Sequence, residues 1–297
     1  MSIKQELINA IKILKENNIE EPNLKARMIL ANILKQSKEY LLIHEEEELS
    51  LNDIKRYEEE IKKLASNVPI QYIINKQEFM GLNFYVDENV LIPQPDTEIL
   101  VEEVINMCRN INCSEPEKTI KVLDLCTGSG AIGVSIAKNI KKCEITLSDI
   151  SCDALKIAQK NSAEVTVLGD TQNNKIKIIQ SDLFEKIEEK FDIIVSNPPY
   201  IETKTIETLN KEVQMEPRIA LDGGEDGLDL YRRIIKEACK YLYNNGILAL
   251  EIGYNQEDRV INLLKESNMY KEIYSKKDLS NIDRIVVCRK NCQKSIE

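Results

Sequence analysis

The sequence contains a single histidine and no C-x-x-C pair among its eight cysteines. Structural and catalytic zinc sites need several closely spaced Cys or His ligands, so we expect no metal site. The lone histidine also argues against a Ser-His-Asp or Cys-His triad. The base would have to be His44, which lies beside the acidic run 45–48. Zinc enzymes and triad hydrolases are therefore disfavoured.

Long hydrophobic runs and an excess of positive charge are also lacking. Charged residues interrupt the apolar residues of 1–17, so we expect neither a signal peptide nor a membrane span. Without a cysteine pairing pattern, a reduced, cytoplasmic location is the simpler interpretation. The formal net charge of −10 argues against tight binding of nucleic acid by a whole surface, which needs clustered Lys and Arg.

The chain of 297 residues, 42% hydrophobic and 30% charged, is long enough for one large or two medium domains. Apolar residues at helical spacing predict a helical domain over 1–75, either a docking domain for a protein substrate or a cap that only buries apolar surface. Strand-like stretches and turn signals predict a hairpin linker over 76–92. The third domain, 93–297, opens with a proline-rich turn in which Asp96 or Thr97 is expected to cap a helix.

From residue 119 onward, apolar strands alternate with helical patterns. The expected strands are 120–126, 144–148, 175–180, 191–196, 246–252 and 284–288. The expected helices are 131–140, 153–161, 228–243 and 256–266. Such alternation predicts the α/β class, with a Rossmann-like, mostly parallel sheet covered by helices on both faces.

The most informative stretch is Asn197-Pro198-Pro199-Tyr200, which follows the apolar run 191–196. Ligands bind at strand ends in open α/β sheets. The two prolines fix the backbone and remove two donors. The Asn197 side-chain oxygen and the Pro198 carbonyl could then accept both hydrogens of a planar NH2 group, with Tyr200 over one face of that group. The alternative is a proline turn that only ends a strand.

A glycine-rich turn follows the first strand of the sheet. It comprises Cys126, Thr127, Gly128, Ser129 and Gly130. Small residues let the backbone approach a ligand, and the next helix offers unsatisfied N–H groups. Asp149 ends the second strand about 20 residues after the last glycine of this turn. At that distance an acidic residue in such folds binds the diol of a ribose. Asp182 ends the third, where it could accept from an exocyclic amine while Leu183 packs on a purine. Both acids could instead cap the segments that follow them.

Together these features look like a class I S-adenosylmethionine-dependent methyltransferase of the type that alkylates planar nitrogens. The segments 91–98, 216–228 and 251–253 narrow the resemblance further. With the helical N-terminus, nearly the whole chain resembles the release factor glutamine methyltransferases, the PrmC/HemK family. The resemblance implies N5-methylation of the glutamine in the Gly-Gly-Gln loop of peptide chain release factors, with S-adenosylmethionine as donor and no metal.

The resemblance also implies roles for individual residues. Asn197, Pro198 and Tyr200 would be catalytic, and with Pro199 they would bind the glutamine amide. The methyl donor would be held by Cys126, Thr127, Gly128, Ser129, Gly130, Asp149, Asp182, Leu183 and Asn197. Segment 201–225 is expected to help seat the protein substrate.

The chain departs from the family pattern at two positions. Family members usually have glycine where this chain has Cys126 and arginine where it has Gln94. A positive φ at Cys126 would be strained. Three other functions fit parts of the pattern: a ribosomal-protein glutamine methyltransferase, an adenine-N6 DNA methyltransferase acting on a flipped base, and a non-catalytic donor-binding module that regulates translation.

Overall fold

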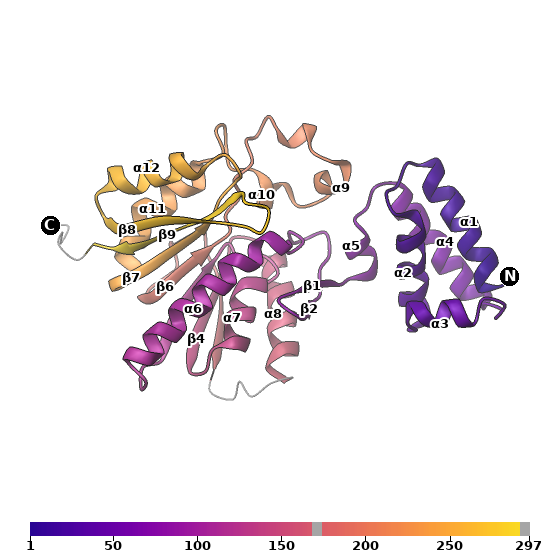
Figure 1. Cartoon of the computed structure of the whole chain (residues 1–297), viewed down its shortest axis with the longest axis horizontal. Helices are drawn as coiled ribbons and strands as arrows, with labels where there is room; N and C mark the ends of the chain where they lie inside the picture. The colour runs from indigo at the N-terminus through magenta and orange to yellow at the C-terminus, as the bar shows by residue number, and fades with distance from the viewer. Residues whose placement is uncertain (168–173, 292–297) are drawn as a thin grey trace. The chain divides into compact units, whose positions relative to one another are not determined.

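The structure is a computed structural model that describes residues 1–167 and 174–291. Its chain divides into two units, which are treated separately (Figure 1). The helical unit comprises Met1–Lys76, Val86–Glu88 and Leu209–Met215. The sheet unit contains the rest of the described chain. No helix among the described residues is both long and apolar enough to cross a bilayer.

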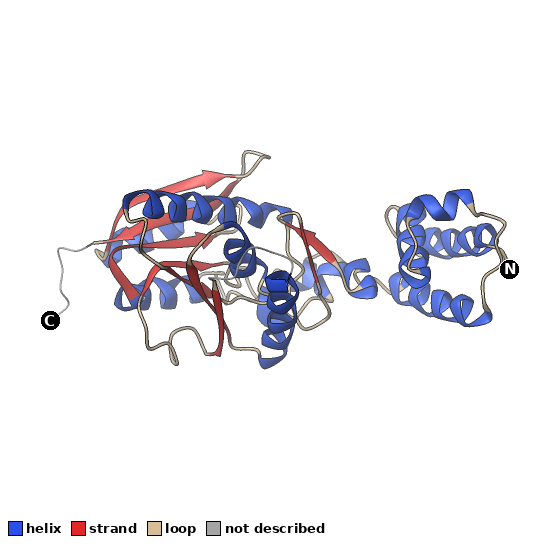
Figure 2. Ribbon diagram, turned by 90° about the horizontal axis from the view of Figure 1, so that it is seen from below, coloured by secondary structure: helices blue, strands red, loops and turns tan. Residues whose placement is uncertain are grey.

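The helical unit is built from short helices with serine caps. Its helices are α1 (Ile3–Glu16), α2 (Pro22–Leu34), α3 (Lys38–Ile43), α4 (Leu51–Ala65), α5 (Ile70–Ile74) and α9 (Lys211–Gln214). Ser2, Ser37 and Ser50 accept the backbone N–H three residues on, at the starts of α1, α3 and α4. The apolar sides of α1, α2 and α4 form one core, and Figure 2 shows the helices nearest the N-terminus gathered in one group. Helix α9 joins this unit through an ion pair of 2.8 Å between Lys25 Nζ and Glu212 Oε1.

The sheet unit contains a seven-stranded sheet in the order β5-β4-β3-β6-β7-β9-β8. Its strands are β3 (Ile120–Leu125), β4 (Cys143–Asp149), β5 (Lys175–Gln180), β6 (Phe191–Ser196), β7 (Leu242–Glu251), β8 (Tyr270–Lys277) and β9 (Asp283–Lys290). The strands from β5 to β7 run parallel, whereas β9 is antiparallel to both of its neighbours. The predicted α/β class with a mostly parallel sheet is confirmed.

Helices cover both faces of this sheet, as the strand pattern predicted. They are α6 (Glu98–Ser114), α7 (Ala131–Asn139), α8 (Cys152–Val167), α11 (Asp229–Tyr241) and α12 (Glu257–Ser267), while the short α10 (Arg218–Leu221) lies in the connection between β6 and α11. Alternate residues of a strand enter different cores because side chains alternate across a sheet. Val122 of β3 packs with residues of α6 and α7, whereas Leu123 packs with residues of α11 and α12.

Three expectations about local structure need correction. Strand β8 was not expected, because its apolar residues are few and it pairs only with β9 at the sheet edge. Strand β7 begins four positions before the predicted 246, in the polar stretch after Leu242. Neither Asp96 nor Thr97 caps α6. A 3-10 turn precedes that helix, Asp96 pairs with Arg284 at 2.9 Å, and the Thr97 hydroxyl accepts from Asn197.

A short hairpin precedes α6, formed by β1 (Gln77–Phe79) and β2 (Leu82–Phe84). Tyr85, the residue that follows this hairpin, is hydrogen-bonded to Asn161 of α8. The Asn161 side chain accepts from Tyr85 N at 2.8 Å and donates to the carbonyls of Tyr85 at 3.0 Å and Ser129 at 2.8 Å. Because Asn161 is only 1% exposed, these three backbone groups depend on one buried amide.

Replacing Asn161 with Ala should lower the free energy of unfolding by about 2–4 kcal/mol, because it leaves buried backbone groups unpaired. Urea denaturation of the full chain measures this change. The matched control is Asn139→Ala, which removes one hydrogen bond, to Ser135 O, at an exposed helix end. Equal losses in the two variants would show that Asn161 has no special structural role.

Candidate active site

The main candidate site is a cavity of about 520 Å³ at the carboxyl ends of β3, β4, β5 and β6. The strand order reverses direction between β3 and β6, and open α/β sheets bind ligands at such a point. The lining is mostly apolar, with a few polar groups such as Asp149, Asp182 and Asn197. No cluster of three or more His, Cys, Asp or Glu side chains with metal-ligand geometry occurs in the described parts of the chain.

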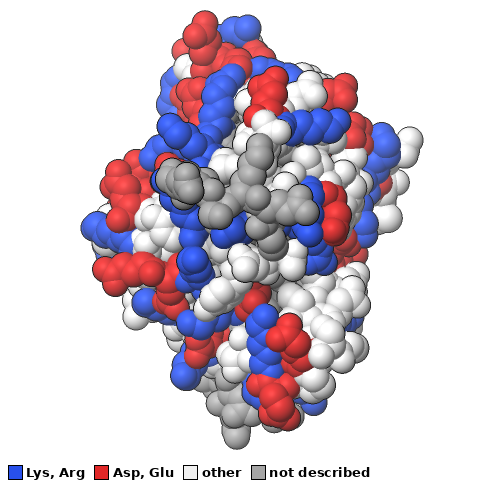
Figure 3. Space-filling model, turned by 90° about the vertical axis from the view of Figure 1, so that its left-hand side faces the viewer, with Lys and Arg blue, Asp and Glu red and all other residues white. Residues whose placement is uncertain are grey.

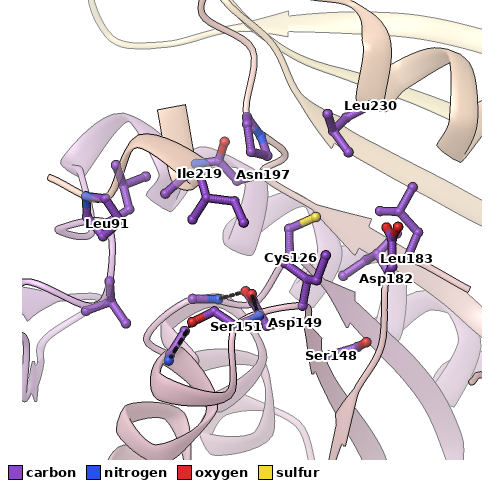
Figure 4. A pocket seen from close by; sticks show the side chains of 18 of the residues that line it. Leu91, Cys126, Ser148, Asp149, Ser151, Asp182, Leu183, Asn197, Ile219 and Leu230 are labelled. Carbon is purple, nitrogen blue, oxygen red and sulfur yellow. Dashed lines mark hydrogen bonds between the residues drawn. The ribbon is translucent and has the colours of Figure 1, made fainter. Parts of the chain in front are cut away.

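The cavity brings together residues that the sequence places on four separate strand ends. Of the predicted site residues, the lining includes Cys126, Gly128, Asp149, Asp182, Leu183, Asn197 and Pro199. The predicted residues outside the lining are Thr127, Ser129, Gly130, Pro198 and Tyr200. Figure 4 shows that the Cys126 sulfur points into the space bordered by Asn197, Leu183 and Leu230.

The glycine-rich turn is held by a buried carboxylate that ends β3. Asp124 Oδ2 accepts from Thr127 Oγ1 at 2.6 Å and from Gly133 N at 2.9 Å. Burial raises the pKa of Asp124 to about 7, although these two donors oppose the shift. A methyl group at Gly133 would collide with Leu147, so the absence of a side chain there lets α7 lie against β4.

Asp149 is tied to the same turn. Its Oδ2 accepts from Gly128 N at 2.9 Å and its Oδ1 accepts from Ser151 N at 2.9 Å. The Gly128 N–H is therefore already satisfied by a protein acceptor. Burial raises the pKa of Asp149 against the pull of these N–H groups. The carboxylate thus both caps its own turn and faces the cavity.

Asp182 and Leu183 line the cavity just after the end of β5. Asp182 Oδ1 accepts from Arg233 Nη2 of α11 at 2.9 Å, and both side chains are partly exposed. Leu183 has a φ of 48° and is 5% exposed, so most of its surface already packs in the core. Sequence inspection missed the Arg233 partner, which lies 51 positions further along the chain.

The Asn197 turn leaves two acceptors without protein donors. Asn197 Nδ2 donates to Thr97 Oγ1 at 3.4 Å, which turns the amide oxygen away from Thr97. Within residues 1–167 and 174–291, no donor reaches Asn197 Oδ1 or the Pro198 carbonyl. The turn can therefore offer both oxygens to a ligand.

Gly223, Gly227 and Gln256 contact the Tyr200 end of this turn. A methyl group at Gly223 would lie 2.7 Å from Tyr200 Cα, and one at Gly227 would collide with the Tyr200 carbonyl. Gln256 Nε2 donates to Tyr200 O at 2.9 Å and to Gly227 O at 3.1 Å. The short segments singled out by the sequence thus pack against the turn.

Tyr200 lies mostly buried and contributes nothing to the cavity lining. Its ring packs against the core that contains α11 and α12. Burial raises the pKa of Tyr200, and the nearby Glu251 charge adds to the rise, while Arg284 opposes it. The Tyr200 ring therefore lies against this core rather than on the cavity, near enough to Glu251 to respond to its charge.

One wall of the cavity was missed by residue-level reasoning. It consists of Asn89, Val90, Leu91, Pro217, Arg218, Ile219, Ala220 and Asp222. Glu216 joins the two loops, because its buried Oε2 accepts from Ile92 N at 2.9 Å. Burial raises the pKa of Glu216 to about 7. In the sequence, the Glu216-Pro217 pair was the signal from which this wall could have been predicted. Gln94, in contrast, donates to Ile92 O on its own loop and makes no ion pair.

Cys126 has a φ of 60°, the strained conformation that its replacement of glycine implied. A left-handed backbone costs a non-glycine residue roughly 1–2 kcal/mol. Burial raises the pKa of the Cys126 thiol, with the Asp149 charge adding to the rise, so the neutral thiol is favoured. The side chain acts as a small, uncharged part of the cavity wall.

Two family models match the chain. Residues 108–278 match the Methyltransferase small domain, and residues 5–74 match the PrmC N-terminal domain. A release factor glutamine methyltransferase of Clostridium acetobutylicum is 44% identical over 291 residues, which cover 97% of this chain and 98% of that protein. One of Clostridium botulinum is 37% identical over 294 residues, covering 98% and 100%.

A solved structure also resembles the chain. It is a protein-(glutamine-N5) methyltransferase (release factor-specific) from Alicyclobacillus acidocaldarius, 27% identical, covering 70% of this chain and 99% of its own, with a TM-score of 0.41.

Replacing Cys126 with Gly should raise the free energy of unfolding by up to about 1 kcal/mol, because it removes left-handed strain. Thermal denaturation measures the gain. Gly128→Ala makes the opposite change at a φ of 53° with no atom within 4 Å of the added methyl group, and it should lose about 1 kcal/mol. A destabilised Cys126→Gly variant would mean that packing of the thiol outweighs its strain.

Proposed function

The chain belongs to the release factor glutamine methyltransferase family, and we propose that it transfers a methyl group from S-adenosylmethionine to a glutamine side-chain amide of a peptide chain release factor. One observation carries the proposal: Asn197 lines the ligand cavity, and neither its Oδ1 nor the adjoining Pro198 carbonyl has a donor among the described residues. A primary carboxamide has the two hydrogens that such a pair of acceptors can bind.

The cavity suits S-adenosylmethionine in both size and polarity. Pockets of about 300–1,000 Å³ hold small ligands, and this one has about 520 Å³. We assign Asp149 to the ribose hydroxyls and Asp182 with Leu183 to the adenine, while the backbone of 126–130 borders the rest. When bound, the donor supplies a methyl carbon that is already electrophilic, so the protein needs to supply neither a metal nor a covalent nucleophile.

The contribution of the Asn197 turn is to position the amide and stabilise its charge. An amide nitrogen is a weak nucleophile, so orientation toward the methyl carbon provides much of the catalysis. Positive charge develops on this nitrogen as its lone pair is used. The oxygens of Asn197 and Pro198 are fixed before the reaction and favour that charge. The new nitrogen–methyl bond would replace the methyl–sulfur bond of the donor, which would leave as the neutral thioether S-adenosylhomocysteine, and the nitrogen would release one proton to water.

The alternatives receive less support from the molecule. An adenine-N6 DNA methyltransferase needs a continuous basic surface, but the chain has a formal net charge of −10, and even the face seen in Figure 3, away from the cavity, carries Lys and Arg interspersed with Asp and Glu. A non-catalytic binding module has no need of a rigid turn with two open acceptors. A ribosomal-protein glutamine methyltransferase would use the same chemistry, and it stands as the second candidate.

We assign selection of the protein substrate to the helical domain and to segment 201–225, part of which lines the cavity. We propose that the helical domain, 1–75, docks the release factor and that segment 201–225 helps seat its glutamine loop, with 76–92 as the linker to the methyltransferase domain. Exposed apolar side chains on the helical unit, such as Leu42 and Ile43, offer contact surface for a protein partner.

Replacing Asn197 with Ala should lower kcat by about 10²–10³ while changing donor affinity far less, because it removes one of two preorganised acceptors. Transfer of labelled methyl to a release factor measures kcat, and calorimetry measures donor binding. Asn110→Ala, an exposed change on α6, is the matched control. Wild-type turnover in the Asn197 variant would refute this mechanism.

Incubation with labelled donor and four separate substrates tests the proposed reaction. The substrates are a release factor, the same release factor with its Gly-Gly-Gln glutamine changed to Ala, a ribosomal protein and duplex DNA. Label should appear only in the first. Label in the ribosomal protein alone would select the second candidate, and label in DNA alone would refute amide methylation.

A further inference from the structure

A buried glutamate lies directly behind Asn197. Glu251 ends β7, which pairs in parallel with β6 so that Ser196 stands opposite Leu250. The next residue of each strand is Asn197 and Glu251, and the two therefore adjoin at the carboxyl edge of the sheet. The Tyr231 hydroxyl donates to the Glu251 backbone carbonyl at 2.7 Å, which anchors the strand end.

The Glu251 side chain is placed to act on the Asn197 amide. Glu251 is 2% exposed and Thr97 is 4% exposed. The Thr97 hydroxyl and the Asn197 amide both stabilise the charged form of Glu251. Asn197 Nδ2 donates to Thr97 Oγ1, which leaves the Thr97 hydroxyl hydrogen for an acceptor. The buried Glu251 Oε2 has no hydrogen-bond partner, so acceptor capacity remains on that side of the turn.

These groups distinguish the two ends of the Asn197 amide. An ionised carboxylate only accepts hydrogen bonds, so it favours the amide NH2 and repels the amide oxygen. If the amide rotated by half a turn, its oxygen would face a buried negative charge and its NH2 would face the cavity. The cavity would then present donors where a substrate NH2 requires acceptors.

We propose that Glu251 is a positioning residue that, together with Thr97, holds the Asn197 carboxamide with Oδ1 toward the substrate amide. The role rests on the proposed function, because it concerns the same acceptor pair. Glu251 does not itself line the cavity. The family resemblance included segment 251–253, but the sequence alone gave no role to this carboxylate.

The titration of Glu251 supplies a readout of this role. Burial raises its pKa to about 7, while Thr97, Arg284 and Asn197 favour the charged form and Asp96 opposes it. The other titratable groups that face Glu251 are Tyr200 and Tyr231. Once protonated, Glu251 can donate as well as accept, and it no longer selects one amide orientation. Activity should therefore rise with pH through about 7 and fall below it.

The test uses the full chain, labelled S-adenosylmethionine and a release factor. Glu251→Gln should lower kcat by about 10²-fold, because a misoriented reacting group costs this much. Donor Kd and release factor KM should change by less than about threefold. The acid limb of the kcat profile should be lost in this variant. Added to Asn197→Ala, Glu251→Gln should cause no further loss, since residues that act as one unit are not additive.

The controls separate this role from general stability. Glu103→Gln alters another buried carboxylate of the same unit, whose partners Tyr274 and Lys276 lie on β8. It should keep wild-type kcat and the acid limb. If Glu251→Gln does not fold, the comparison of Thr97→Val with Thr97→Ser tests the role instead. Ser keeps the hydroxyl and should keep most of the activity, whereas Val removes the hydroxyl and should lose it.

Two results would overturn the inference while leaving the proposed function intact. One is a Glu251→Gln enzyme with wild-type kcat and an unchanged acid limb. The other is a loss that adds fully to that of Asn197→Ala. If the wild-type chain itself transfers no label to a release factor, the proposed function fails instead, and the comparison of variants is not reached.

Discussion

The structure depends on how the Asn197–Tyr200 turn is kept rigid, because this turn cannot hold itself. Two prolines remove its backbone donors, so no hydrogen-bond ladder continues from β6. Its support comes from neighbours: Gln256 binds the Tyr200 carbonyl, and Gly223 allows backbone to lie against Tyr200 Cα. The same lack of internal hydrogen bonds leaves the Pro198 carbonyl without a donor among the described residues. The two prolines therefore account both for the rigidity of the turn and for its unpaired backbone acceptor.

Buried carboxylates perform a related task around the cavity. Asp124 holds the glycine-rich turn, Glu216 joins the two loops of the missed wall, and Glu251 lies behind Asn197. Each is buried enough that its pKa rises to about 7. Loops carry backbone groups that no regular structure satisfies, and a carboxylate can satisfy several of them from one position. The cost of burying charge is thus offset by order in the loops that border the ligand.

Local pattern was sufficient for most of the sheet unit. The runs 175–180 and 191–196 are strands with the predicted bounds, since their apolar, β-branched composition needs no distant partner to be recognised. Strand β8 was missed because it is polar and the only strand it pairs with, among the described residues, is β9. The expected cap at Thr97 was wrong for a similar reason. Its hydroxyl has a competing partner, Asn197, located 100 positions away, and no local rule contains that contact.

By itself, the sequence determined the fold class, the strand ends that carry polar residues and the family, because these follow from periodicity and from short contiguous motifs. Only the tertiary structure decided which of those residues border one cavity, that Asp149 already binds Gly128, and that Asp182 pairs with Arg233. It also placed the Tyr200 ring against the core and Glu251 beside Asn197. The physical reason is that burial and hydrogen-bond partners depend on groups brought together from distant strands. The identity of a residue as Asp or Glu does not show whether its carboxylate faces water or a buried amide.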